Sequence, residues 1–238
     1  MIFIIIPAFN EEKNIAELLS NINNLNLEEK IKVILVNDGS KDKTEEIAKF
    51  FINKMNLEII SHSFNQGVGD TFRDGLMHTE KQVGNDDIIA IIEGDNTSDL
   101  NLLPLMIKKI KDRTDLVIAS RYIKSGGYKN FPFKRFIGSW LVNLVLKSRF
   151  RIKGVTDYTI FYRVYRAKII KQAFNKYGRD FIKTKSFASN LEILLKVKEF
   201  CLKVGESPFV YNYGLKQGNS KINILKTLWE YKDLILFF

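Results

Sequence analysis

Short apolar runs alternate with amphipathic segments through the first half of this 238-residue chain. The apolar runs cover residues 1–6, 31–36, 57–61, 88–92 and 116–119. The segments between them, in which apolar residues recur three and four positions apart, cover residues 15–22, 47–51, 71–78 and 102–110. Neighbouring parallel strands need a crossover connection, which is usually a helix. The alternation therefore predicts an α/β fold, with a mostly parallel sheet and helices on both of its faces.

The composition is that of a folded protein without disulfides. Hydrophobic residues make up 45% of the chain, which is enough for a full core. The single cysteine, Cys201, excludes an intrachain disulfide, and the first residues lack the basic segment and cleavage site of a secretory signal. No apolar run reaches the ~18 to 20 residues that span a bilayer. We therefore expect a cytoplasmic protein that does not cross a membrane.

The charges are divided unevenly along the chain. Residues 1–119 hold 13 Lys and Arg against 20 Asp and Glu, whereas residues 120–238 hold 24 against 7. An acidic half suggests a cation site, and a strongly basic half suggests an anionic partner. The composition leaves three such partners open: a phosphate group, a nucleic acid or an anionic lipid surface.

Three polar loops follow the predicted strands, at residues 7–11, 37–40 and 93–99. The carboxyl ends of parallel strands lie at one edge of a sheet, so these loops should line one crevice. Glu93 and Asp95, two positions apart, can both reach one hard cation, which prefers oxygen ligands. The alternative is a helix-capping loop in which Ser98 or Asp99 caps the next helix. Asn10 is expected to cap the first helix.

Two other nucleotide-binding motifs do not fit. Gly67 and Gly69 lack a third glycine in register for a dinucleotide site, and the chain has no phosphate-binding lysine loop. The two histidines lie outside the motifs. We expect His62 to be a solvated residue at a strand end and His78 to belong to a helix face.

Seven short motifs together resemble the glycosyltransferases of family two, which have the GT-A fold, and among them the dolichyl- or polyprenyl-phosphate sugar synthases. In chain order the motifs are Pro7-Ala8-Phe9-Asn10-Glu11, Asn37-Asp38-Gly39-Ser40, Asn65-Gln66-Gly67-Val68-Gly69, Glu93-Gly94-Asp95, Ser120-Arg121-Tyr122, Asp157-Tyr158-Thr159 with Arg163, and Lys216-Gln217-Gly218-Asn219-Ser220-Lys221. The sequence departs from the family pattern at four places: Glu93 and Asn37 replace aspartates, Ile160-Phe161 replaces Ser-Gly, and Lys216 replaces an arginine.

The resemblance implies an inverting transfer of a sugar from a GDP- or UDP-sugar to a polyprenyl or dolichyl phosphate, assisted by Mg²⁺ or Mn²⁺. It implies metal binding by Glu93, Asp95 and Thr97. The implied donor-binding residues are Pro7, Phe9, Glu11, Asp38, Gly67, Arg73, Gly94, Lys216, Ser220 and Lys221. The implied residues for the acceptor phosphate are Arg121, Arg135, Ser139 and Arg163. Asp95, Arg121 and Arg135 are the expected catalytic residues.

A basic, aromatic-rich segment follows the fifth strand. Residues 121–153 contain nine Lys and Arg and no Asp or Glu, and residues 133–147 have an apolar helical face. Such a helix is typical of one that lies in a membrane interface. A core helix and a groove for single-stranded nucleic acid are the alternatives, but the nucleic-acid reading leaves the acidic crevice unexplained. We therefore expect a peripheral protein on the cytosolic face of a membrane, with no nucleic-acid partner.

We expect a single domain over residues 1–222, with a nucleotide-sugar half at 1–119 and an acceptor half at 120–222. Residues 223–238 are expected to form a C-terminal amphipathic helix. A transferase acting on a sugar hydroxyl remains the second hypothesis, and it needs a general base, for which Asp157 is the candidate. The third is an inactive protein that binds membrane or nucleic acid. The sequence does not fix the nucleotide, the sugar or the oligomeric state.

Overall fold

The computed structural model describes residues 1–218 and 221–238, and these residues build a central seven-stranded sheet. Its order is β3-β2-β1-β4-β7-β5-β8, and all neighbours are parallel except β7, which runs antiparallel to β4 and β5. The strands are β1 (Ile2–Ala8), β2 (Ile31–Asn37), β3 (Leu57–Ser61), β4 (Ile88–Ile91), β5 (Leu116–Ser120), β7 (Arg163–Arg166) and β8 (Val204–Pro208). A two-stranded sheet pairs β6 (Gly127–Lys129) with β9 (Val210–Asn212). The predicted mostly parallel α/β fold is confirmed.

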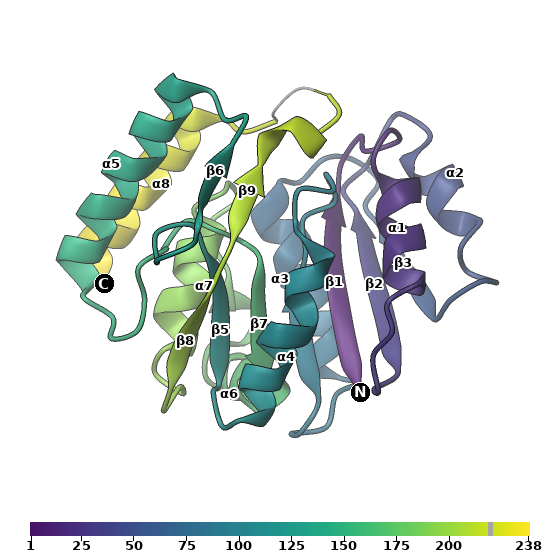
Figure 1. The fold of residues 1–238 in the computed structure, drawn as a ribbon, viewed down its shortest axis with the longest axis horizontal. Coiled ribbons are helices and arrows are strands. Elements are labelled where there is room, and N and C mark those ends of the chain that lie inside the picture. Colours follow the sequence, from purple (N-terminus) through teal and green to yellow (C-terminus); the bar gives the residue numbers. More distant parts are fainter. Residues whose placement is uncertain (219–220) are drawn as a thin grey trace.

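Helices cover both faces of the sheet (Figure 1). On one face lie α1 (Ile15–Asn23) and α4 (Leu103–Lys111), and on the other lie α3 (Val68–Glu80), α6 (Ala167–Tyr177) and α7 (Ser189–Val197). The short α2 (Thr44–Lys49) packs beside α1. Because β1 and β4 are covered on both sides, all residues from Ile2 to Ile6 and from Ile88 to Ile91 are buried. This double cover explains why their sequences are continuous apolar runs.

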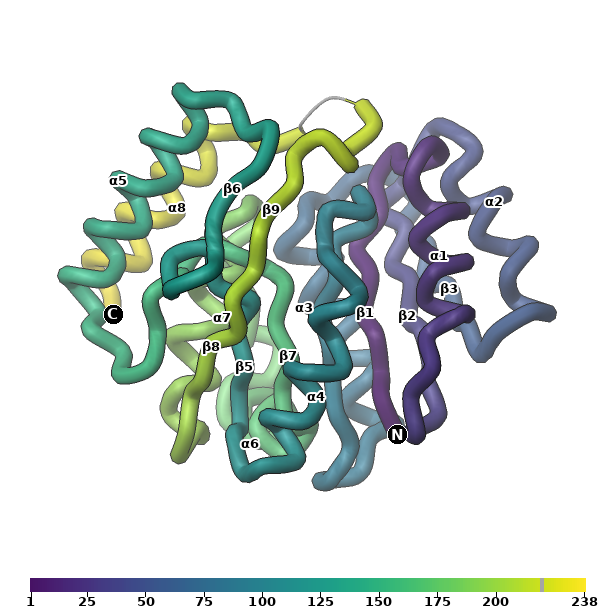
Figure 2. The backbone as a smooth tube through the Cα atoms, viewed as in Figure 1, coloured from purple at the N-terminus to yellow at the C-terminus, as the bar shows by residue number. Residues whose placement is uncertain are grey.

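Two helices stand apart from the two layers. α5 (Phe133–Phe150) and α8 (Ile224–Phe237) lie side by side at one end of the molecule in both backbone views (Figures 1 and 2). The Arg149 guanidinium donates a hydrogen bond to the Ile235 carbonyl across this pair. Among the described residues, no helix is long and apolar enough to cross a membrane.

Several elements were not predicted from the sequence: β6, β7, α6 and β8. β7 is only four residues long and has arginine at both ends, so it lacks the apolar run by which the other strands were found. The prediction that Asn10 caps the first helix was wrong. The helix begins at Ile15 after Asn14, and the Asn10 side chain instead accepts a hydrogen bond from the Lys41 amide at 2.8 Å.

Candidate functional site

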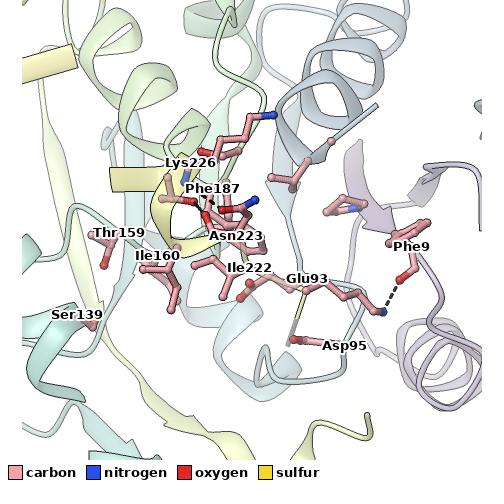
Figure 3. Close-up of a pocket in the computed structure, with 18 of the residues that line it drawn as sticks. Phe9, Glu93, Asp95, Ser139, Thr159, Ile160, Phe187, Ile222, Asn223 and Lys226 are labelled. Atoms are coloured by element: carbon pink, nitrogen blue, oxygen red, sulfur yellow. Dashed lines mark hydrogen bonds between the residues drawn. The ribbon is translucent and has the colours of Figure 1, made fainter. Parts of the chain in front are cut away.

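A cavity of about 800 Å³ opens at the carboxyl edge of the parallel strands. The loops after β1, β2 and β4 form one side of it, and α5, α8 and the segments near them form the other. Figure 3 shows Glu93, Asp95 and Phe9 on the strand-end side, across from Ser139, Thr159 and Ile160. The predicted convergence of the three strand-end loops is thus seen in the structure, since Glu11, Asp38 and Glu93 all line this cavity.

Asp95 is held from two directions in the loop after β4. Its Oδ1 accepts hydrogen bonds from the Thr97 amide at 3.2 Å and from the Thr97 hydroxyl at 2.6 Å. Its Oδ2 lies 2.5 Å from the Lys216 ammonium group. Burial would lower the pKa of Lys216, but the Asp95 carboxylate outweighs burial and raises it. Thr97 is buried and absent from the cavity wall, so it positions Asp95 rather than presenting its hydroxyl to a metal ion as predicted.

Glu93 is the second carboxylate of this pair. Burial in the cavity wall and the neighbouring Asp95 raise the pKa of Glu93 to about 8. Gly94 lies between them, and a Cβ there would come within 2.6 Å of the Pro7 carbonyl oxygen. Only glycine therefore lets the loop pack against β1 and keep both carboxylates at the cavity.

The donor chemistry of these two carboxylates fits a hard divalent cation. Carboxylate oxygens are the ligands that Mg²⁺ and Mn²⁺ prefer, and such ions usually keep places for water and for substrate phosphates. Within residues 1–218 and 221–238, no group of three or more Asp, Glu, His or Cys side chains could hold a metal ion. Glu93 and Asp95 could therefore hold a metal ion only together with oxygen atoms from a bound ligand or water.

Asp38 supports the glycine turn that follows β3. Its carboxylate accepts hydrogen bonds from the Gln66 amide at 2.8 Å and the Gly67 amide at 2.9 Å. Gly67 has φ of 104°, in the region that favours glycine, and a Cβ there would meet the Lys185 carbonyl oxygen at 2.5 Å. His62 also contacts Asp38, with its Nδ1 at 2.8 Å from Oδ1. The prediction of a solvated His62 was wrong, because its side chain is only 6% exposed.

The late motif reaches across the cavity to the first strand. The Lys221 ammonium group donates to the Asn10 carbonyl at 2.6 Å and lies 2.5 Å from the Glu11 carboxylate. It also donates to the Phe9 carbonyl, the contact drawn as a dashed line in Figure 3. The backbone of Gln217 also forms two hydrogen bonds with the Asn14 side chain, one as donor and one as acceptor. Ser220, a predicted donor-binding residue, lies outside the described residues.

On the opposite side, Arg121 forms a buried ion pair with Asp157. The guanidinium donates from Nε to Oδ2 at 2.7 Å and from Nη2 to Oδ1 at 2.8 Å. Nη2 also donates to the Thr159 hydroxyl at 2.6 Å, and the ring of Tyr128 lies 5.2 Å from the guanidinium. Burial alone would raise the pKa of Asp157, but the charge and hydrogen bonds of Arg121 hold it below its ordinary value.

Arg135 and Ser139 extend this basic side from the first turns of α5. The Arg135 guanidinium donates to the Tyr213 hydroxyl at 2.9 Å, and both residues line the cavity. The Ser139 hydroxyl lies 3.2 Å from the Tyr122 hydroxyl and 3.3 Å from that of Tyr128. The structure thus places Arg121, Arg135 and Ser139 along one wall.

Besides Thr97, two predicted site residues do not line this cavity. Arg163 is 1% exposed on β7, and its guanidinium donates to the carbonyl oxygens of Asn190 at 2.6 Å and Tyr158 at 3.0 Å. Nη1 and Nη2 are used inside the protein, and Nε is buried without a hydrogen-bond partner among the described residues, so the structure does not bring Arg163 to the acceptor wall as predicted. Arg73, a predicted donor-binding residue, is also absent from the cavity wall and instead contacts Asp70 and Asp74 on its own helix.

Other lining residues were missed from the sequence. They are the cations Lys134, Lys185 and Lys226 and the aromatic residues Phe187, Tyr211, Tyr213 and Tyr231. The basic composition of the second half was the signal for the lysines, but no motif marked which of them face the cavity. Lys185 does so because its loop packs against the glycine turn, where the Gly69 amide donates to the Lys185 carbonyl.

An open α/β sheet with its cavity at the carboxyl edge, paired carboxylates on one side and arginines on the other, defines a protein built to bind an anionic ligand next to a cation. Residues 3–174 match the sequence profile described as "Glycosyl transferase family 2". The chain belongs to this family, and its fold is the GT-A type.

Individual relatives agree with this assignment. The chain is 28% identical over 232 residues to a dolichol-phosphate mannosyltransferase of Pyrococcus furiosus, and the match covers 96% of the chain but 60% of that relative. It is 25% identical over 245 residues to a dolichyl-phosphate beta-glucosyltransferase of Trichomonas vaginalis, covering 98% and 71% of the two proteins. The glucosyl-3-phosphoglycerate synthase of Mycobacterium tuberculosis, solved with Mn²⁺ and UDP, superposes with a TM-score of 0.67 at 15% identity, over 99% of this chain and 77% of that one. This likeness shows the fold.

Proposed function

We propose that this protein transfers one sugar, with inversion, from a nucleoside diphospho-sugar to a polyprenyl or dolichyl phosphate. The two relatives described above are both named for transfer involving dolichol phosphate, and they differ in the sugar. The shared feature is the acceptor class, and the proposal therefore specifies the acceptor and leaves the hexose and the nucleotide base open. The first relative is much longer than this chain, so its activity is a guide to the class of reaction.

The observation that carries the proposal is the distribution of charge around the cavity. The acidic residues that line it all belong to residues 1–119: Glu11, Asp38, Glu93 and Asp95. Beyond Asp95, every charged residue in the described wall is Lys or Arg. This division supports a donor half at 1–119 and an acceptor half at 120–222. It suits an acceptor that arrives as an anion.

The same wall argues against a hydroxyl acceptor. A sugar hydroxyl must lose its proton to a base, whereas a phosphate oxygen is already an anionic nucleophile and needs positioning only. Asp157, the candidate base, is fully buried and does not line the cavity. Its carboxylate forms an ion pair with Arg121. In the described part of the acceptor half, the cavity wall therefore offers cations to a phosphate but no carboxylate to a hydroxyl.

On the donor side, Glu93 and Asp95 would hold Mg²⁺ or Mn²⁺, which would neutralise charge on the departing nucleoside diphosphate. The ammonium groups of Lys216 and Lys221 each lie 2.5 Å from a carboxylate on the cavity wall. When the donor binds, its diphosphate oxygens would take over some of these contacts with the two ammonium groups. Asp38, through the amides that it holds, would keep the glycine turn open toward the nucleoside.

On the acceptor side, the phosphate would lie between Arg121 and Arg135. A guanidinium has five N–H donors, and Arg121 spends three of them on Asp157 and Thr159. Its Nη1 group has no protein acceptor among the described residues, which leaves two donors for a phosphate oxygen pair. Ser139, one turn along α5 from Arg135, can donate a further hydrogen bond.

The prenyl chain of the acceptor would contact the protein at the end of the molecule that α5 and α8 form. The apolar face predicted for α5 is exposed: Trp140 is 45% and Leu144 is 49% accessible, and α8 exposes Trp229 at 62%. A helix packed in the core would have buried these side chains. With the basic residues of α5 beside them, these faces suit a membrane interface, and we propose that the protein binds peripherally to the cytosolic face.

The test is a transfer assay with two acceptors offered separately. GDP- and UDP-hexoses with Mg²⁺ would be incubated with undecaprenyl phosphate in detergent micelles, or with a methyl glucoside as a hydroxyl acceptor. We expect a sugar-linked prenyl phosphate in the first reaction and no methyl disaccharide in the second. Transfer to the glucoside alone would replace the proposal with the hydroxyl-acceptor hypothesis. If the protein binds no nucleoside diphosphate, the remaining hypothesis is an inactive protein that binds membrane or nucleic acid.

A further inference from the structure

His62 connects the nucleotide side of the cavity to a buried network of charges. It lies just beyond β3 and lines a second cavity of about 370 Å³, which shares Phe9 and Asn65 with the main cavity. The backbone of His62 is fixed to β2, since its amide donates to the Asn37 carbonyl at 2.9 Å. The ring is therefore brought to Asp38 by strand pairing.

The imidazole ring of His62 stands between two carboxylates. Its Nδ1 lies 2.8 Å from Asp38 Oδ1, and its Nε2 lies 3.3 Å from Asp74 Oδ2. In the part of the chain that the structure describes, Nε2 is buried without a hydrogen-bond partner. Each ring nitrogen thus faces a carboxylate oxygen, and the hydrogen bond is made at Nδ1, to Asp38.

Asp74 is itself held in place on α3. Its Oδ1 accepts a hydrogen bond from Arg73 Nε at 3.1 Å, and Arg73 also contacts Asp70 one turn earlier. A continuous set of contacts thus runs from α3 through His62 to Asp38. Arg73, which does not reach the cavity, fixes the carboxylate that faces the His62 ring.

Asp38 has limited capacity left for a ligand. A carboxylate has about four acceptor positions, and Asp38 spends two of them on Oδ1, for His62 and the Gln66 amide, and one on Oδ2, for the Gly67 amide. The remaining lone pair on Oδ2 is available only while the carboxylate keeps this rotation. Loss of the His62 contact would free one acceptor position on Oδ1 and remove one of the three contacts that set the rotation of the carboxylate.

We propose that His62 is a positioning residue for the nucleoside diphosphate: together with the Gln66 and Gly67 amides it fixes the rotation of Asp38 and so presents Oδ2 to the ligand. This inference rests on the proposed function, since it assumes that the cavity binds a nucleoside diphosphate. His62 acts through Asp38 and is placed away from the reacting atoms. Its loss should raise the donor KM and leave kcat at saturating donor close to that of the parent.

The test compares variants of the only two histidines in the chain. His62→Asn keeps an amide N–H near the position of Nδ1, whereas His62→Leu removes the donor. His78 is the matched control, because it also contacts a carboxylate, that of Glu58 at 2.7 Å, but lies outside both cavities. Affinities for UDP and GDP would be measured by calorimetry with excess Mg²⁺, together with thermal melting.

We expect His62→Leu to weaken binding of the preferred nucleotide about tenfold, or about 1.4 kcal/mol, and His62→Asn to stay within about threefold of the parent. His78→Leu should bind as the parent does. Equal binding by parent and His62→Leu would overturn the inference and leave the proposed function intact. A parent protein that binds neither nucleotide would instead overturn the proposed function. Equal losses in the Asn and Leu variants, with unchanged melting, would also overturn the role of the Asp38 contact.

A second measurement does not depend on how the variants fold. In a proton NMR spectrum of the parent protein, each of the two histidines should give one Hε1 resonance, and His78→Asn would assign them. Addition of the nucleotide should shift the His62 resonance and leave that of His78 in place. A titration that saturates by calorimetry without moving the His62 resonance would refute the coupling between His62 and the ligand.

Discussion

Replacing Arg121 with methionine should destabilise the protein strongly, because Asp157 would lose the one charged partner that it has among the described residues. Asp157 is fully buried, and Arg121 gives it two charge-assisted hydrogen bonds, at 2.7 and 2.8 Å. After the change, its carboxylate keeps only backbone amides of the nearby chain and the Thr159 hydroxyl.

The size of the loss follows from these contacts. Each hydrogen bond to a charged group contributes about 1.5–3 kcal/mol, so two of them give about 3–6 kcal/mol. Breaking a buried ion pair by removing one partner costs about 3–5 kcal/mol, which agrees with that sum. We therefore expect Arg121→Met to lower the free energy of unfolding by about 3–5 kcal/mol at pH 7.

The loss should also depend on pH. In the parent, Arg121 holds the pKa of Asp157 below its unfolded value, so the pair stabilises the fold above that value and loses its effect as pH falls through the lower, folded pKa. In the variant, burial without Arg121 would raise the pKa of Asp157, so its carboxyl group could be protonated at low pH. The difference between parent and variant should therefore shrink as pH is lowered from 7 toward 4.

Urea unfolding followed by circular dichroism at both pH values would measure these differences. The double variant Arg121→Met with Asp157→Asn supplies the control, since it removes the buried charge and should recover about 2 kcal/mol of the loss. A single-variant loss below about 1 kcal/mol, or a double variant no more stable than the single one, would refute the reasoning.

Three further predictions concern activity and membrane binding. Asp95→Asn should still melt cooperatively, at a lower temperature than the parent because Lys216 loses its carboxylate partner, but it should lose metal-dependent binding of nucleoside diphosphate, which calorimetry with and without Mn²⁺ would show; a parent-like transfer rate would contradict the metal assignment. Arg135→Ala should lower transfer to prenyl phosphate by about 2–4 kcal/mol of transition-state stabilisation while slow hydrolysis of the donor persists, with Arg149→Ala on the same helix as the unaffected control. Trp140→Glu combined with Leu144→Glu should release the protein from anionic liposomes without loss of cooperative melting, because both side chains are already exposed; unfolding would show that they pack in a core.

The strand-end loops could be predicted because their position depends only on local pattern. An apolar run followed by a polar loop and an amphipathic segment fixes the strand direction, and parallel strands bring their carboxyl ends to one edge. Glu93 and Asp95 were found in this way. The exposure of the α5 apolar face could not be decided from its sequence, because a core helix and an interfacial helix share the same periodicity. Only the three-dimensional arrangement shows that no layer covers it.

The burial of His62 and Arg163 could not be predicted from motifs or from the apolar pattern. His62 follows a strand and precedes a polar turn, which is typical of a solvated residue. Its burial depends on the pairing of β2 with β3 and on Asp74 in the following helix. Both are tertiary contacts, which a local sequence pattern does not show. Arg163 stands at a motif position but belongs to an antiparallel strand inserted between β4 and β5, where carbonyl oxygens of the interior accept hydrogen bonds from its Nη1 and Nη2 groups.

Two ion pairs join the acidic half and the basic half of the chain across the cavity. Lys216 from the basic half lies on Asp95 of the acidic half, and Lys221 lies on Glu11. A divalent cation at Asp95 would compete with the Lys216 ammonium for the same carboxylate oxygen, whereas a diphosphate offers that ammonium a new partner. Metal and nucleoside diphosphate are therefore expected to bind together more readily than either binds alone, because each supplies the charge that the other displaces.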